Sequence, residues 1–80
     1  MIPNVAGYYL HDLGMLLKQY ALQSRDEARA AKGTDAYDFK SGHALAYHSV
    51  VRLMQQQAEV FQIPLEAIGL ADIDADRDLL

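Results

Sequence analysis

Three histidines, at positions 11, 43 and 48, are the first side chains to consider for metal binding or acid–base chemistry. None stands in a His-Glu-x-x-His motif, and the sequence holds no Glu-x-x-His repeat of the kind that builds a di-iron bundle. His43 lies on the apolar side of a predicted helix, and a hairpin that turns near Thr34 brings it opposite Glu27. Glu27 and His43 are therefore weak candidates for a metal site; the alternatives are a structural hydrogen bond or exposure near the hairpin tip. We expect no catalytic residue and no bound cofactor.

Four aspartates alternate with other residues late in the sequence, as the ligands of a calcium-binding loop do. They are Asp72, Asp74, Asp76 and Asp78. The sixth position of such a loop requires glycine and is Arg77 here, so an EF-hand is rejected. The sequence has no cysteine, which excludes disulfides and thiolate zinc sites, and it shows no P-loop, nucleophile elbow or dinucleotide fingerprint. We expect residues 71–80 to form an acidic tail that keeps the protein soluble or contacts a basic partner.

The stretch from Phe39 to Phe61 is the element around which the rest of the chain is organised. At about 100° per residue its apolar and polar side chains fall on opposite sides, which is typical of a long amphipathic helix. The apolar arc consists of Phe39, Ala46, Tyr47, Val50, Leu53, Met54, Val60 and Phe61. The opposite arc consists of Asp38, Ser41, His48, Arg52, Gln55, Glu59 and Gln62. We predict a helix over residues 36–62, because Pro64 disfavours a helical conformation at Ile63.

An earlier helix is predicted over residues 4–32, with its entry at Pro3 or a cap at Asn4. Ser24 and Glu27 match a capping box, which would instead start a new helix at that point. The apolar arc continues in phase across the capping box, so we predict one unbroken helix.

A ladder of small side chains runs along one edge of this earlier helix. Gly7, Gly14, Ala21 and Ala28 recur every seven residues. Each glycine inside a helix costs about 1 kcal/mol relative to alanine. We interpret the ladder as a surface that lets another helix backbone approach closely.

A short turn at residues 33–35 joins the two helices and makes them antiparallel neighbours. Gly33 suits the left-handed position that follows a helix, and Thr34 or Asp35 is expected to cap the second helix. Proline first and glycine last frame a short helical turn over residues 64–69.

Both long helices carry apolar arcs that cover close to half of their circumference, more than a two-helix hairpin can bury. For this all-α domain, predicted over residues 1–70, the simplest closure is a homodimer that forms a four-helix bundle. A different protein is the first alternative cover for the surplus surface, and a monomer covered by its own short helix and tail is the second. The side chains expected at the interface are Tyr9, Leu13, Leu16, Tyr20, Phe39, Tyr47, Val50, Leu53, Met54, Gln57 and Phe61.

Gln57 is the one polar side chain in the middle of the second helix's apolar arc, about opposite Tyr9 and Leu13. A single buried polar residue in a bundle fixes register and oligomeric state, and we predict that role for it. The alternative is a ligand site formed by Gln57 and Tyr9.

The composition argues against disorder and against general nucleic-acid binding, since 51% of the residues are hydrophobic and the net charge is −4. A basic stripe on the first helix is interpreted as a solvated face rather than a phosphate-facing surface. It consists of Lys18, Arg25, Arg29 and Lys32. We recognise neither a signal peptide nor an apolar run of the roughly 20 residues that cross a bilayer, so a cytoplasmic location is expected.

The leading prediction is a non-catalytic protein–protein interaction or regulatory module that acts as a homodimer. The apolar helix face and the acidic tail are its expected contact surfaces for a protein partner. The alternative is a small ligand- or metal-binding bundle enzyme that uses Glu27 and His43.

Overall fold

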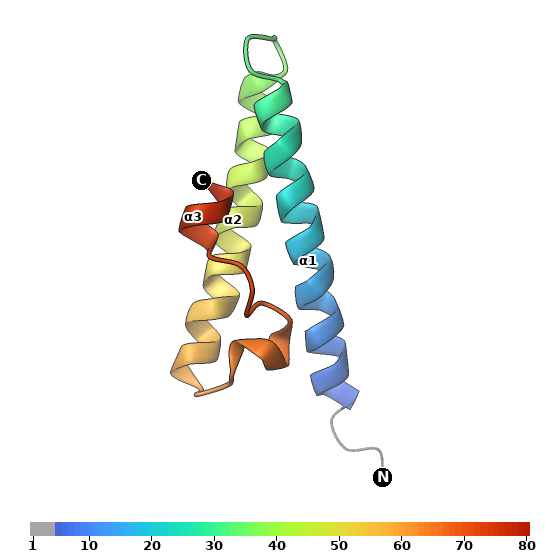
Figure 1. Ribbon diagram of the computed structural model, residues 1–80, viewed down its shortest axis with the longest axis vertical. Coiled ribbons are helices and arrows are strands. Elements are labelled where there is room, and N and C mark those ends of the chain that lie inside the picture. The colour runs from blue at the N-terminus through green and yellow to red at the C-terminus, as the bar shows by residue number, and fades with distance from the viewer. Residues whose placement is uncertain (1–4) are drawn as a thin grey trace.

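The computed structural model describes residues 5–80, and these residues form an all-helical structure (Figure 1). Its elements in chain order are α1 (Val5–Ala30), α2 (Tyr37–Val60), the 3-10 turn η1 (Leu65–Ile68) and α3 (Ala75–Leu79). The predicted hairpin of two long helices is confirmed, and α1 passes through Ser24 without a break. The 3-10 turn η1 lies within the helical turn predicted over residues 64–69, whereas the sequence pattern does not predict α3. The predicted helix entry at Pro3 or Asn4 lies outside the described residues.

The two long helices contact each other mainly through small side chains. The buried residues of α1 are Gly14, Ala21, Ser24 and Ala28. The buried residues of α2 are Ala44, His48, Val51 and Ala58. Small side chains let helix backbones approach closely. Of the large apolar residues in α1 and α2, Val51 is fully buried and the others are exposed or half-buried.

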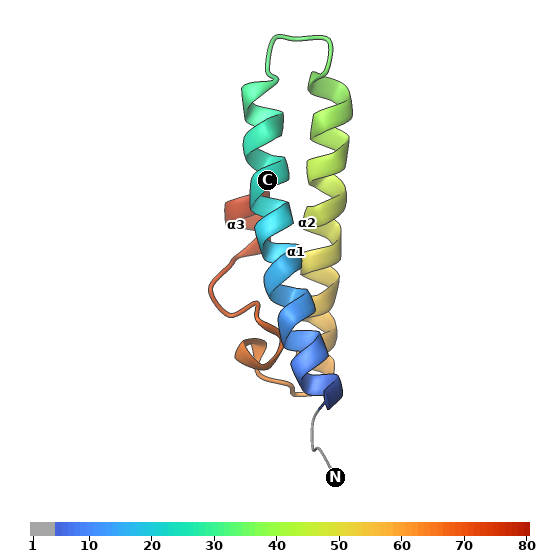
Figure 2. The ribbon, with the colours of Figure 1, turned by 90° about the vertical axis from the view of Figure 1, so that its right-hand side faces the viewer.

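The C-terminal segment (residues 61–80) folds back along one face of the hairpin. It lies in front of the long helices in Figure 1 and to one side of both in Figure 2. It supplies five of the eight side chains of the buried core, and Leu70 among them is 0% exposed. These five are Ile68, Leu70, Ile73, Ala75 and Leu79. Residues 71–80 therefore do not form the separate acidic tail that the sequence predicts; they complete the same domain.

The turn between α1 and α2 differs from the prediction in how it is capped. Gly33 adopts the expected left-handed conformation, with φ of +86°. The N-cap of α2 is Ala36, which makes no side-chain cap, so the predicted cap at Thr34 or Asp35 is wrong. The Thr34 hydroxyl instead donates to the Ala31 carbonyl at 2.6 Å and accepts from the Ala36 N–H at 3.3 Å. The Thr34 side chain thus stabilises the turn and does not cap α2.

The backbone of η1 approaches α1 closely at two glycines. A Cβ atom added at Gly14 would overlap the Ile68 carbonyl oxygen. A Cβ atom added at Gly69, whose φ is +71°, would lie 2.6 Å from the His11 carbonyl oxygen. The close approach that we predicted for the small-residue ladder therefore occurs at Gly14, but against η1 rather than against another long helix.

Candidate functional site

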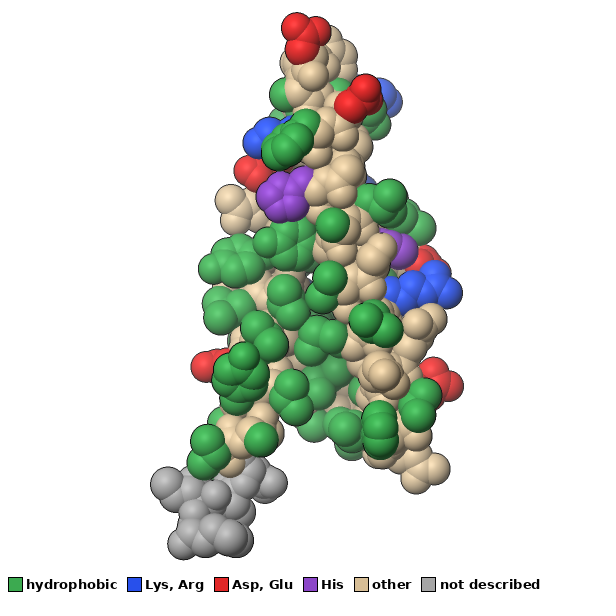
Figure 3. Space-filling view, turned by 180° about the vertical axis from the view of Figure 1, so that it is seen from behind, with side chains coloured by type: hydrophobic (Ala, Val, Ile, Leu, Met, Phe, Trp, Pro, Cys, Tyr) green, Lys and Arg blue, Asp and Glu red, His purple; other side chains and the backbone are tan. Residues whose placement is uncertain are grey.

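A broad apolar surface lies on the side of the hairpin that the C-terminal segment leaves uncovered (Figure 3). Phe39 is 73% exposed, Phe61 70% and Leu53 56%. We call this surface the open face. It comprises the exposed Tyr9, Leu16, Tyr20, Phe39, Val50, Leu53, Gln57 and Phe61 with the half-buried Leu13, Tyr47 and Met54. None of these eleven predicted interface residues is buried within the single chain.

A row of rings lies across the open face and joins the two helices. His43 stacks on Tyr47 with ring centroids 5.3 Å apart, and Phe39 meets His43 edge-on at 6.2 Å. Tyr20 of α1 approaches Tyr47 of α2 at 6.5 Å. Such ring pairs contribute about 0.5–1.5 kcal/mol beyond their buried area, so the row holds its side chains in a defined arrangement. The ring row therefore links α1 and α2 on the open face.

The predicted pairing of Glu27 with His43 is not present. Both side chains are exposed, and neither a hydrogen bond nor an ion pair joins them. His43 belongs to the ring row instead. Across residues 5–80, no group of three His, Asp or Glu side chains is arranged to hold a metal ion. Gln57 is exposed on the open face, so it has no buried polar role within one chain.

The small-residue ladder occupies the buried side of α1 rather than the open face. Gly14, Ala21 and Ala28 are buried, and Gly7 is half-buried. The ladder therefore serves the contacts of α1 with α2 and with η1 inside the domain.

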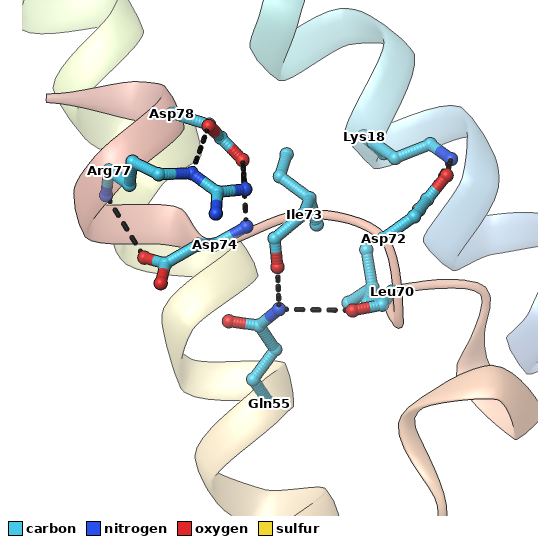
Figure 4. A network of polar contacts seen from close by, with 8 residues as sticks. All are labelled: Lys18, Gln55, Leu70, Asp72, Ile73, Asp74, Arg77 and Asp78. Carbon is cyan, nitrogen blue, oxygen red and sulfur yellow. Dashed lines mark hydrogen bonds and ion pairs between the residues drawn. The ribbon is translucent and has the colours of Figure 1, made fainter.

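The aspartates of the C-terminal segment each find a partner, and Figure 4 shows the contacts of Asp72, Asp74 and Asp78. Lys18 of α1 donates to both oxygens of Asp72 at 2.9 Å. Asp74 caps α3 by accepting from the Arg77 N–H at 3.0 Å, and its own N–H donates to Asp78 at 2.9 Å. This reciprocal capping lets a five-residue helix form where the alternating aspartates alone gave no helical pattern.

Asp76 joins α3 to α2 through two side chains that the sequence placed on the solvated arc. The His48 Nε2 lies 2.8 Å from the Asp76 Oδ1, and Arg52 Nη1 donates to the two Asp76 oxygens at 2.9 and 3.1 Å. His48 is only 8% exposed, and its Nδ1 is buried without a hydrogen-bond partner. The polar arc of α2 is thus a second packing surface, specific for the C-terminal segment.

Gln55 makes the most direct polar contact with the chain between η1 and α3. Its Nε2 donates to the Leu70 carbonyl at 3.1 Å and to the Ile73 carbonyl at 2.8 Å. Replacing Gln55 with Leu leaves both carbonyls without this donor, and we expect the free energy of unfolding to fall by about 1–3 kcal/mol. Urea unfolding at a fixed protein concentration measures this loss. The neighbouring exposed Gln56 is the control, and equal losses in Gln55→Leu and Gln56→Leu would refute the role of the two hydrogen bonds.

Three aspartates have carboxyl pKa values held below the ordinary range by these contacts. The hydrogen bond from Lys18 lowers the pKa of Asp72, and the hydrogen bond from His48, aided by the Arg52 charge, lowers that of Asp76. The hydrogen bond from Arg77 and the N–H of Asp74 lower the pKa of Asp78 to about 2. Folding therefore favours the ionised form of each of these carboxyl groups.

Acid is expected to release the C-terminal segment. Because the folded pKa values lie below the unfolded value of about 3.9, the stabilisation is complete above about pH 5 and is lost as the pH falls toward 2. Methyl resonances of Ile73 and Leu79, followed by NMR through this range, report the release. The Asp72→Asn variant lacks one of the titrating groups and should show a smaller dependence on pH. Methyl shifts that stay constant down to pH 2 would contradict the expectation.

The basic stripe on α1 is divided between two environments. Lys18 is bound to Asp72, and Arg25 donates to the Asp78 carbonyl oxygen at 3.0 Å while pairing with Asp26 at 2.9 Å. Arg29 and Lys32 make no ion pair within the described residues. The stripe is therefore not a continuous cationic surface, which weighs against a phosphate-backbone interface.

No family model matches the chain, and comparison with curated proteins and with solved structures gives no significant match. Within residues 5–80, no helix combines the length and the hydropathy that crossing a bilayer requires.

Proposed function

We propose that this protein is a non-catalytic interaction module that acts as a homodimer through its open face. The observation that carries the proposal is the exposure of large apolar side chains along the whole hairpin on that face. Soluble monomers rarely expose contiguous apolar patches of more than a few hundred Å². The C-terminal segment does not cover the open face, because it lies on the opposite side of the hairpin.

A second copy is the occupant that fits best. The whole chain is long and thin, 53 × 22 × 16 Å, so it has little depth in which to bury a core. A copy related by a twofold axis brings an open face of the same length and the same apolar character, and the two hairpins then form a four-helix bundle. Gln57 would become buried in that bundle, where one polar residue fixes register.

The solution mass tests this proposal. Light scattering over a series of concentrations should give twice the 8.9 kDa of one chain at high concentration and a lower mass on dilution. Nuclear Overhauser contacts between labelled and unlabelled chains should connect side chains of the open face, such as Tyr47 and Leu53. A single-chain mass at every concentration, or intermolecular contacts confined to the C-terminal segment, would overturn the proposal.

A further inference from the structure

A groove lies beside α3, lined by residues of α1, α2 and the end of α3. Figure 1 shows α3 packed along the hairpin below its tip. The volume of the groove is about 450 Å³, within the range of small-ligand pockets. The floor consists of Ala28 and Ala44, which are both buried, and Leu79 closes one end. The groove belongs to the side of the hairpin occupied by α3, so it is separate from the open face.

The charge around this groove is unlike that of the chain as a whole. Three of the seven basic residues line it, and no acidic side chain does, although the net charge is −4. Arg25 is already engaged by Asp26 and by the Asp78 carbonyl oxygen. Arg29 and Lys32, which follow it on α1, have no carboxylate within ion-pair distance among the described residues. The groove therefore has two cations available to a ligand.

The opposite rim adds neutral hydrogen-bonding groups from the first turns of α2. The hydroxyl groups of Tyr37 and Ser41 line the groove there, and Leu45 extends the apolar surface. A larger groove lies between α2 and the C-terminal segment, and both signs of charge, Arg52 and Asp76 among them, line it. Because both signs of charge are present, this larger groove favours neither an anionic nor a cationic ligand. The charged side chains that line the groove beside α3 are all basic and lie next to apolar residues, which favours an anion that carries an aliphatic chain.

We propose that this groove binds a free fatty carboxylate of medium chain length. The carboxylate lies between Arg29 and Lys32, where charge-assisted hydrogen bonds hold it. The aliphatic chain lies over Ala28 and Ala44 toward Leu79, removing apolar surface from water. Inorganic phosphate offers the charge without the apolar part, so it binds far more weakly.

Octanoate is the probe, and amide shifts of the ¹⁵N-labelled protein report where it binds. We expect saturable shifts at Ala28, Ala44 and Leu79. The Arg29→Gln and Lys32→Gln variants should each weaken binding by about three- to tenfold, as expected for losing one partly exposed charge contact. Lys40→Gln removes a charge outside the groove and should leave the affinity unchanged.

Several outcomes would overturn the assignment. Octylammonium or inorganic phosphate that binds as tightly as octanoate would show that the groove does not recognise an amphipathic anion. Equal affinities in Arg29→Gln, Lys32→Gln and Lys40→Gln would remove the role of the rim cations. Shifts centred on Leu53 would place the aliphatic chain on the open face instead. Each result is independent of the solution mass, so the groove and the homodimer are tested separately.

Discussion

Substituting alanine for glycine should destabilise the protein at Gly14 and stabilise it at Gly42. A Cβ atom at Gly14 overlaps the Ile68 carbonyl oxygen and lies 2.9 Å from the Ile68 carbonyl carbon. These are backbone atoms, so relief of the overlap requires η1 to move away from α1. We expect Gly14→Ala to lower the free energy of unfolding by about 1–3 kcal/mol, even though alanine is the better helix former. Gly14→Leu should detach η1 from α1 entirely.

Gly42 is a matched control because it also lies inside a long helix. Nothing approaches within 4 Å of a Cβ atom added there. Gly42→Ala should therefore show only the gain in helix propensity, about 0.5–1 kcal/mol. Urea unfolding of both variants, at one protein concentration, measures the two changes in the free energy of unfolding. Gly14→Ala with stability equal to that of Gly42→Ala would show that α1 and η1 are not in contact as described.

Leu53→Asp should separate the proposed homodimer while leaving each chain folded. Leu53 is 56% exposed in the single chain, so the substitution breaks no buried contact within the domain. In a twofold bundle it removes two leucines from the interface and places two carboxylates there, where charge is costly to desolvate. We expect the dissociation constant to rise at least about 100-fold, with helical circular dichroism retained. Light scattering over a concentration series measures the dissociation constant.

Gln56→Asp adds the same charge three residues further along α2. Gln56 lines the groove between α2 and the C-terminal segment rather than the open face, so this variant should stay dimeric. If Leu53→Asp and Gln56→Asp have the same mass and the same helicity as the parent protein, the open face is not the interface. If Leu53→Asp unfolds, Leu53→Gln provides the comparison without a charge.

The elements of this fold were predictable because local signals specify them. The period of the apolar residues predicts two long helices, and Gly33 and Pro64 mark where each one stops. These signals depend only on residues close together in the sequence. The open face was predictable for the same reason, because the helical period alone places Leu53 on the apolar arc. The period does not indicate what covers that arc.

The docking of the C-terminal segment was not predictable from local pattern. Four aspartates among its last nine residues suggested a solvated tail, whereas Ile73, Ala75 and Leu79, each next to one of them, are buried. Their partners, including Lys18 and Arg52, lie far away in sequence, and no local rule pairs them. A signal was nevertheless present. The tail carries four acidic residues, and the polar arcs of the long helices include Lys18 and Arg52, which are charge partners for them.

The contacts of Gln55 and His48 were also not predictable from the sequence. A glutamine or histidine on a polar arc is usually solvated, and neither residue type indicates that a carbonyl or carboxylate will lie above it. Only the path of the chain after Gly69 brings Leu70, Ile73 and Asp76 to these side chains. Burial of these polar groups is therefore a result of tertiary structure.

The position of the core along the chain has a consequence for biosynthesis. A ribosome delivers α1 and α2 before the last core side chains are added. Five of the eight side chains of the buried core cluster belong to residues 68–79, and the two long helices contribute Ala21, Val51 and Ala58 to it. The core cluster is completed only when residues 68–79 have been synthesised. Products that stop before residue 68 would then be open substrates for proteases.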